Sequence, residues 1–298
     1  MKTETFQSQP AIRIESGKST ALLAPGHGAR LLSWSIGDTP IIRWPDNADW
    51  SRPAKVRGGD PVLFPFIART FCDGKIGFWR DGAGTVRPAP MHGFARDSAF
   101  SITDAGPDFL RVGMESNDTT NACYPFAFRF EVIHRIGPDW LDTSFCVTNK
   151  GDRPMPWSAG HHFYFHLPAA DRADWELELP CQNWGSQDFS DGSIHLASPA
   201  CSKAPVSDPA WIDRFHVQPS IAGIRLAPKS GSPAIRFEDS SPVPGAWHCV
   251  TTWTENAGSD FFCVEPWSAL PDAIHNGMGL RHLAPGATDE ISIRIRAA

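Results

Sequence analysis

The chain has 298 residues, of which 41% are hydrophobic and 20% charged, and its formal net charge is -6. This acidic balance argues against nucleic acid or an anionic membrane surface as a partner. No run of 18 apolar residues predicts a membrane span, and the polar start MKTETFQSQPAIRIESG lacks the apolar stretch of a signal peptide. Seven cysteines without a CxxC pair favour reduced, mostly buried thiols. We therefore expect a cytoplasmic protein.

Apolar and polar residues alternate along much of the chain, which predicts β-strands. FAFRFEVIHRI (126–136) and LDTSFCVTN (141–149) flank the turn residues Gly137, Pro138 and Asp139, and this pattern predicts a β-hairpin. DWELELP (174–180) and EISIRIRAA (290–298) alternate in the same way, whereas DPAWIDRF (208–215) predicts at most one short helical turn. With 25 Gly and 27 Pro dividing the strands, we expect an all-β fold, a large antiparallel sandwich forming one domain over residues 1–298.

Two glycine-containing segments carry candidate binding residues. GGDPVLFPFIART (58–70) has a turn at Gly58-Gly59 and delivers Arg69, which is either an exposed charge or a donor to a polar ligand. MHGFARDSAF (91–100) places His92 before a glycine, where the backbone approaches a ligand closely, and Arg96 follows four residues later.

SAGHHFYFHLP (158–168) contains three histidines within six positions. On a strand, His162, Tyr164 and His166 face one side and His161 faces the other. A metal site built on His162 and His166 would need a further carboxylate or thiolate ligand. The zinc-binding motif HEXXH is excluded because no Glu occupies the required place. An acid–base histidine or a packed polar residue is the favoured interpretation.

The segment DFFCVEPWSALPDAIHNG (260–277) places Glu265 between an apolar run and Pro266-Trp267. Desolvation in such surroundings should raise the pKa of the carboxyl toward the value that a general base needs. The chain also has 12 Trp and 19 Phe but only two Tyr. These rings form a thick aromatic core, or a few of them line a sugar-binding cleft, with Trp267 and Trp79 as candidates.

In order and spacing, these segments resemble the aldose 1-epimerase (galactose mutarotase-like) family. The resemblance rests on GGxPVLFPxxxR, HGFAR, VTNKGDRPMPWSAGHHFYFHLP and FFCVEPWSALPDAIHNGMGLRHLAPGAT, which together run from about residue 58 to residue 288. It implies a β-supersandwich and an isomerase that interconverts the α and β anomers of a free aldose without a cofactor or metal. The implied partner is a small sugar, free or phosphorylated, and the chain is expected to be a monomer or homodimer.

The same resemblance implies roles for individual residues. Glu265 acts as the base on the anomeric O1–H, His162 as the acid toward the ring oxygen, and His92 assists at the sugar. The implied substrate-binding residues are Arg69, Arg96, Tyr164, His161 and Trp267. His161 stands directly before His162 and is the fallback for the acid.

Three alternatives stand beside this reading. A hexose-6-phosphate mutarotase would use Arg96 at the phosphate, with Lys75, Arg80 and Arg87 of the loop TFCDGKIGFWRDGAGTVRPAP nearby. A non-catalytic carbohydrate-binding or regulatory protein on the same fold would bind sugar without needing the Glu265 and His162 pair. A metal-dependent enzyme would use His162 and His166.

Overall fold

The computed structural model describes residues 1–297, and the expected all-β architecture is confirmed: every ladder between named strands is antiparallel. The first sheet has 11 strands, in the spatial order that follows. They are β1 (Lys2–Phe6), β2 (Gln9–Ser16), β3 (Ser19–Ala24), β4 (Arg30–Ile36), β5 (Thr39–Ile42), β15 (Phe163–His166), β24 (Phe261–Trp267), β23 (Cys249–Trp253), β20 (Arg214–Pro219), β17 (Cys181–Gln187) and β18 (Ile194–Ala197).

The second sheet has nine strands. In spatial order they are β10 (Ser101–Ala105), β11 (Phe109–Glu115), β12 (Phe128–Ile136), β13 (Trp140–Asn149), β26 (Thr288–Ala297), β22 (Ile235–Asp239), β21 (Arg225–Pro228), β16 (Trp175–Glu178) and β19 (Lys203–Pro205). Three two-stranded pairs complete the β-structure: β14 (Met155–Trp157) with β25 (Arg281–Leu283), β6 (Phe71–Cys72) with β7 (Lys75–Ile76), and β8 (Phe78–Arg80) with β9 (Val86–Pro88).

Helices are short, as the sequence indicated. The α-helices are α1 (Asp118–Cys123) and α2 (Ala273–Asn276), and 3-10 turns cover Pro53–Lys55, Ala95–Asp97, Ala169–Asp174, Pro209–Trp211 and Ile221–Gly223. The short turn expected near residue 208 is the one at Pro209–Trp211, after which β20 begins. Within residues 1–297 no helix is long and apolar enough to cross a membrane.

The predicted hairpin is confirmed as β12 and β13, and their ladder joins Phe128 to Asn149 at one end and Ile136 to Leu141 at the other. The predicted C-terminal strand is β26, although Ala298 lies outside the described residues. Apolar side chains of β2, β12, β15, β24 and β26 meet between the two sheets in one hydrophobic core. The core contains residues from Ile12 to Ala297, so both ends of the chain contribute to it.

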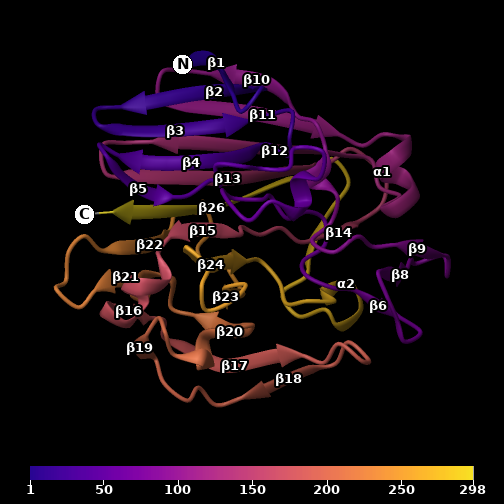
Figure 1. Cartoon of the computed structure of the whole chain (residues 1–298). Coiled ribbons are helices and arrows are strands. Elements are labelled where there is room, and N and C mark those ends of the chain that lie inside the picture. The colour runs from indigo at the N-terminus through magenta and orange to yellow at the C-terminus, as the bar shows by residue number, and fades with distance from the viewer. Residues whose placement is uncertain (298) are drawn as a thin grey trace.

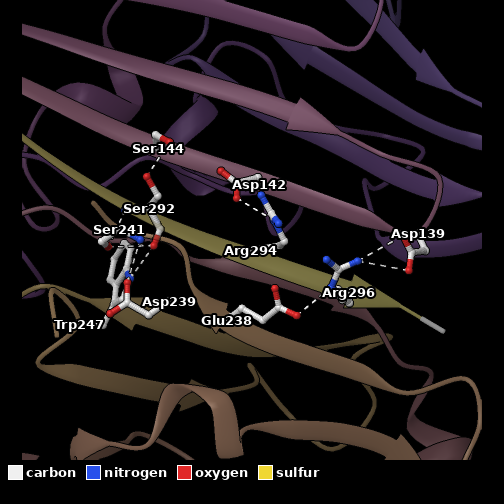
Figure 2. A network of polar contacts seen from close by, with 10 residues as sticks. All are labelled: Asp139, Asp142, Ser144, Glu238, Asp239, Ser241, Trp247, Ser292, Arg294 and Arg296. Carbon is white, nitrogen blue, oxygen red and sulfur yellow. Dashed lines mark hydrogen bonds and ion pairs between the residues drawn. The ribbon is translucent and has the colours of Figure 1, made fainter. Parts of the chain in front are cut away.

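On the other face of β13, polar side chains contact β26, which is in turn joined by polar contacts to β22 (Figure 2). Ser292 Oγ donates to Ser144 Oγ at 2.7 Å, and Arg294 Nε donates to Asp142 Oδ2 at 3.0 Å. Asp142 and Ser144 face away from the main core, since they alternate along β13 with core residues, yet both are buried. Their burial is tolerated because each polar group has a hydrogen-bonding partner. All seven cysteines of the chain are free thiols.

The strands that carry the candidate site lie in the middle and lower part of the first sheet. Figure 1 shows β15, β24, β23, β20 and β17 descending in this order. Alternation along β24 sends Phe262 and Val264 into the main core, whereas Cys263 packs on the opposite face. Glu265 therefore lies on the face of the sheet that is turned away from the main core.

Candidate active site

A cavity of about 250 Å³ lies on this outer face of the first sheet. The strands supply its floor, and the segments around residues 57–69 and 91–92 supply its walls. The residues that line it are Arg57, Ala68, Arg69, Met91, His92, His162, Ser186, Gln187, Phe189, Asp213, Phe215, Thr251, Trp253, Glu265 and Trp267. A volume of this size suits a ligand smaller than a typical drug molecule.

Glu265 is the buried carboxyl group of this cavity. Its side chain belongs to β24, and the residue is only 1% exposed. Burial raises the pKa of Glu265 well above its ordinary value, and the carboxylate charges of Asp213 and Asp60 raise it further. The buried setting that the sequence predicts for Glu265 is therefore confirmed.

His162 lies immediately before β15 and faces Glu265. Its Nδ1 is 3.5 Å from Glu265 Oε1 and has no hydrogen-bond partner. The imidazole stacks flat on the ring of Tyr164, with centroids 4.8 Å apart, and the edge of Trp253 closes another side. Burial, reinforced by the charges of Arg96 and Arg30, lowers the pKa of His162 to about 3.

These two shifts describe one coupled pair. Burial disfavours the charged form of each group, so the carboxyl tends to hold a proton and the imidazole tends to be neutral. A neutral pair and a carboxylate–imidazolium pair carry the same single proton. The arrangement therefore places one transferable proton beside the cavity.

His92 completes the group of titratable side chains facing the cavity. Its backbone is left-handed (φ 64°), which turns the imidazole back toward residue 68, and its Nδ1 accepts a hydrogen bond from the Ala68 N–H at 3.2 Å. Burial lowers the pKa of His92 well below its ordinary value, with the charge of Arg96 acting in the same direction. The ring is therefore neutral with its proton on Nε2, which makes it a hydrogen-bond donor.

Charged and aromatic side chains form the rim. The Arg69 guanidinium lies 4.1 Å from the centroid of the Phe189 ring, and Phe189 is 54% exposed. Asp213, whose backbone is left-handed (φ 51°), also lines the cavity. Trp267 Nε1 donates to His161 O at 3.1 Å, which fixes the indole that forms part of the wall.

Three polar atoms of the lining are buried without a partner. They are His162 Nδ1, Thr251 Oγ1 and Gln187 Oε1. An unsatisfied buried polar atom costs about 1–3 kcal/mol. All three atoms belong to residues that line the cavity.

Five of the eight residues proposed from the sequence line the cavity, namely Glu265, His162, His92, Arg69 and Trp267. His161 is fully buried on the opposite side, stacked between Phe145 and Phe163, where the core lies. The strand phasing that separated His161 from His162 is thus confirmed.

Tyr164 and Arg96 are also absent from the lining. Tyr164 lies beneath His162 and is 2% exposed. Arg96 Nη2 donates to Met91 O at 2.6 Å, so its guanidinium holds the backbone behind the cavity. Both residues support cavity residues from behind.

The basic loop does not contribute to the cavity either. Arg80 pairs with Asp73 at 2.5 Å and Arg87 with Asp81 at 2.6 Å, so both charges are neutralised locally. Trp79 donates from Nε1 to Cys123 O and packs in the main core rather than in a cleft. The aromatic surplus of the chain is therefore mostly core, with Trp267, Trp253, Phe215 and Phe189 at the cavity.

Among residues 1–297 the one group of three candidate metal ligands is His162, Cys263 and Glu265, whose donor atoms lie within 4.8 Å of one another. His166 is not part of it, contrary to the metal alternative drawn from the sequence. Burial raises the pKa of the Cys263 thiol well above its ordinary value. Metal binding there would require ionising this thiol and would occupy the carboxyl–imidazole pair.

The β-sandwich thus holds a buried carboxyl–imidazole pair, Glu265 and His162, at a small polar cavity. Such a pair can transfer protons to and from a small molecule. The family model described as aldose 1-epimerase matches residues 10–186. The chain therefore belongs to the aldose 1-epimerase family, a family of carbohydrate epimerases and mutarotases.

The chain is also similar to the following proteins. The uncharacterized protein YphB of Escherichia coli K12 is 26% identical, over 74% of this chain and 91% of its own length. A galactose mutarotase-like protein from Clostridium acetobutylicum has a similar structure, with a TM-score of 0.83 at 16% identity over 100% of this chain and 98% of that one. The Slr1438 protein of Synechocystis sp. PCC 6803 gives 0.79 at 21% identity over 100% and 99%. These structures show the fold.

Several cavity residues could not be found in the sequence. Asp213 directly precedes β20, Thr251 lies within β23 and Gln187 ends β17. These strands meet only in the folded chain, and no local motif marks the three residues. Asp60, by contrast, stands within the quoted segment GGDPVLFPFIART, directly after the two glycines. An acidic residue at the start of an apolar run was a signal that pointed to a buried carboxylate.

Proposed function

We propose that this protein is an aldose 1-epimerase that interconverts the α and β anomers of a free hexose. The observation that carries the proposal is the buried Glu265 carboxyl 3.5 Å from an unpartnered His162 nitrogen, at the floor of a cavity. Such a pair can take a proton from one oxygen of a substrate and give a proton to another.

Mutarotation needs this kind of exchange. The reactive form of the pair is the carboxylate–imidazolium form, which carries the same single proton. In it Glu265 accepts the proton of the anomeric O1–H while His162 protonates the ring oxygen, the bond from C1 to the ring oxygen breaks, and C1 and O1 form a carbonyl. Rotation about C1–C2 then presents the other carbonyl face, and the ring closes as both proton transfers reverse. The pair begins and ends with one proton, so no other reactant is consumed.

The remaining lining residues have matching roles. His92 Nε2–H, Arg69 and the Thr251 hydroxyl offer hydrogen bonds, and the Asp213 carboxylate accepts them from sugar hydroxyls. Trp267 and Phe215 present apolar surface to the C–H groups of a pyranose ring. Positioning by these groups adds to the factor of about 10²–10⁴ that each acid or base contributes to the rate.

A hexose 6-phosphate is the second candidate substrate, and it is favoured by one observation: Arg57 and Arg69 both line the cavity. Arg96, which the sequence proposed for the phosphate, donates to Met91 O instead. Arg57 forms an ion pair with Glu255 at 3.0 Å and lies over the ring of Trp253, so part of its charge is already balanced within the protein. Free sugars therefore come first.

The test is anomer exchange measured by polarimetry and by NMR on freshly dissolved α-D-glucose and α-D-galactose and on their 6-phosphates. We expect faster equilibration of a free sugar and a loss of about 10²–10⁴ in kcat for Glu265→Gln and for His162→Gln. Arg57→Gln should matter only if a phosphosugar is the substrate. Binding detected by calorimetry without any exchange would instead indicate a carbohydrate-binding protein.

A further inference from the structure

A tight turn places one more carboxylate beneath the acid–base pair. Gly59 has a φ of +69°, and a Cβ built on it would lie 2.1 Å from Leu31 O, so only glycine fits there. The next residue, Asp60, donates its N–H to Leu31 O at 2.8 Å and is completely buried. The turn therefore carries an acidic side chain into the interior.

Both oxygens of Asp60 are used by the two adjacent histidines. Oδ1 accepts the backbone N–H of His162 at 2.7 Å, and Oδ2 lies 2.7 Å from His161 Nδ1. A charge-assisted bond to the backbone of His162 fixes the point from which its side chain departs. Asp60 itself does not line the cavity.

The contacts of His161 indicate how the proton is distributed. Its ring is sandwiched between Phe145, with centroids 4.3 Å apart, and Phe163, 4.7 Å apart, and its Nε2 has no partner. An imidazolium would leave one N–H unsatisfied among these apolar rings, at a high cost. His161 is therefore neutral and donates from Nδ1, so that Asp60 remains a carboxylate with two accepted hydrogen bonds.

We propose that Asp60 is a positioning residue of the acid–base pair: its buried carboxylate fixes the backbone of His162, and its negative charge keeps the shared proton on the pair. This inference rests on the proposed mutarotase function. The charge effect follows from Coulomb's law, because a fixed negative charge in a low-dielectric interior opposes ionisation of a nearby carboxyl group.

Glu265 has charged and titratable neighbours on every side. They are His162, Cys263, His92, Asp213, Arg57 and Arg69, with Asp60 beneath. After burial, which is the largest cause, the charges of Asp213 and Asp60 are the two that raise the pKa of Glu265. Asp213 lies at the exposed rim, whereas Asp60 has no exposure, so solvent screens the second charge less.

The first experiment uses Asp60→Asn, which keeps the shape and the acceptor for the His162 N–H but removes the charge. The Glu265 carboxyl is followed by ¹³C NMR over a pH titration, with its signal assigned by its absence in Glu265→Gln. We expect the midpoint to move to lower pH in Asp60→Asn. The alkaline limb of the kcat profile, where the pair loses its last proton, should move in the same direction while KM stays unchanged.

The second experiment uses Asp60→Ala, which also removes the acceptor. Displacing a catalytic group by about 1 Å costs roughly 100-fold, so we expect a loss of about 100-fold in kcat, larger than in Asp60→Asn. Asp142→Asn is the matched control, since Asp142 is also a buried, paired carboxylate but lies on β13 of the other sheet. This control should leave the Glu265 midpoint unchanged.

An unchanged Glu265 midpoint in Asp60→Asn would overturn the charge effect, and a wild-type kcat in folded Asp60→Ala would overturn the positioning effect. Should Asp60→Ala not fold, Asp60→Asn still decides the first point. The NMR titration needs no turnover. A protein that exchanges no sugar anomers but still shows the shifted midpoint would therefore refute the proposed function and leave the influence of Asp60 on Glu265 intact.

Discussion

A buried histidine outside the cavity gives a sharp prediction about stability in acid. His134 lies on β12 and has no exposed surface, with Nε2 3.1 Å from Ala29 O and Nδ1 3.1 Å from the Thr143 hydroxyl. A carbonyl oxygen only accepts, so Nε2 carries the proton and Nδ1 accepts from Thr143. A second proton, on Nδ1, would break the hydrogen bond from the Thr143 hydroxyl. The informative variant is His134→Gln, because the glutamine amide is not protonated in this pH range.

The magnitude follows from the pKa of His134. Burial lowers it from 6.5 to about 4. On acidification, His134 takes up a proton near pH 6.5 in the unfolded chain but only near pH 4 in the folded chain. The contribution of neutral His134 to the free energy of unfolding is therefore fully present above pH 6.5 and is lost as the pH falls from 6.5 to about 4. At about 1.4 kcal/mol per unit, His134 alone removes about 2 kcal/mol from the free energy of unfolding between pH 7 and about pH 4.5.

Urea unfolding followed by tryptophan fluorescence measures this difference at the two pH values. Wild type should lose more stability on acidification than His134→Gln, by about 2 kcal/mol. His195→Gln, on the exposed strand β18, is the matched control and should behave like wild type. His162 and His216, each with a pKa lowered to about 3 by burial, keep part of the acid sensitivity in all three proteins.

Equal losses in wild type and His134→Gln would refute the assignment of this acid sensitivity to His134. A variant too unstable to measure does not end the test. The imidazole proton signals of the wild-type protein report the titration of His134 directly. A midpoint near pH 6.5 instead of about 4 would also refute the assignment of this acid sensitivity to His134.

Two further predictions concern the site. Glu265→Gln should be more stable than wild type, with a difference in Tm that grows as the pH rises above 4.5. The pKa of Glu265 is raised in the folded chain, so folding favours the protonated carboxyl group. Wild type therefore loses this contribution to its free energy of unfolding as the pH rises through the folded pKa, whereas the glutamine variant does not. A Tm difference that is constant with pH would contradict this account. Gly59→Ala should destabilise the protein by more than about 1 kcal/mol and lower kcat as well, because its Cβ meets Leu31 O. Gly26→Ala, whose Cβ meets nothing within 4 Å, is the control, and equal thermal melting of the two variants would show that the turn is not constrained.

The sequence could predict much of the local structure because side chains alternate with a period of two along any strand. The period in 126–136 and 141–149 predicted the β12–β13 hairpin, and the phase of 161–165 placed His161 in the core and His162 on the other face. The buried environment of Glu265 also followed from its neighbours in the chain. In each case the deciding information lies within a few residues.

Tertiary structure decided which side chains share the cavity. His162 and Glu265 are about a hundred residues apart and meet because β15 pairs with β24 in a register that joins Phe163 to Val264. Asp213 and Thr251 enter through the pairing of β20 and β23 with that strand. Arg96 was expected at the ligand but donates to Met91 O, because a guanidinium binds the nearest acceptors that the fold offers.

The amino-acid sequence by itself thus determined the strands, their faces and the chemical groups available, since these depend on backbone geometry and on side-chain chemistry. Only the tertiary structure decided that Asp60 lies beneath two adjacent histidines and that the proton of Glu265 and His162 is shared inside a buried cavity. The physical reason is that strand register and desolvation are properties of the packed chain. Neither can be read from a segment before its partners are known.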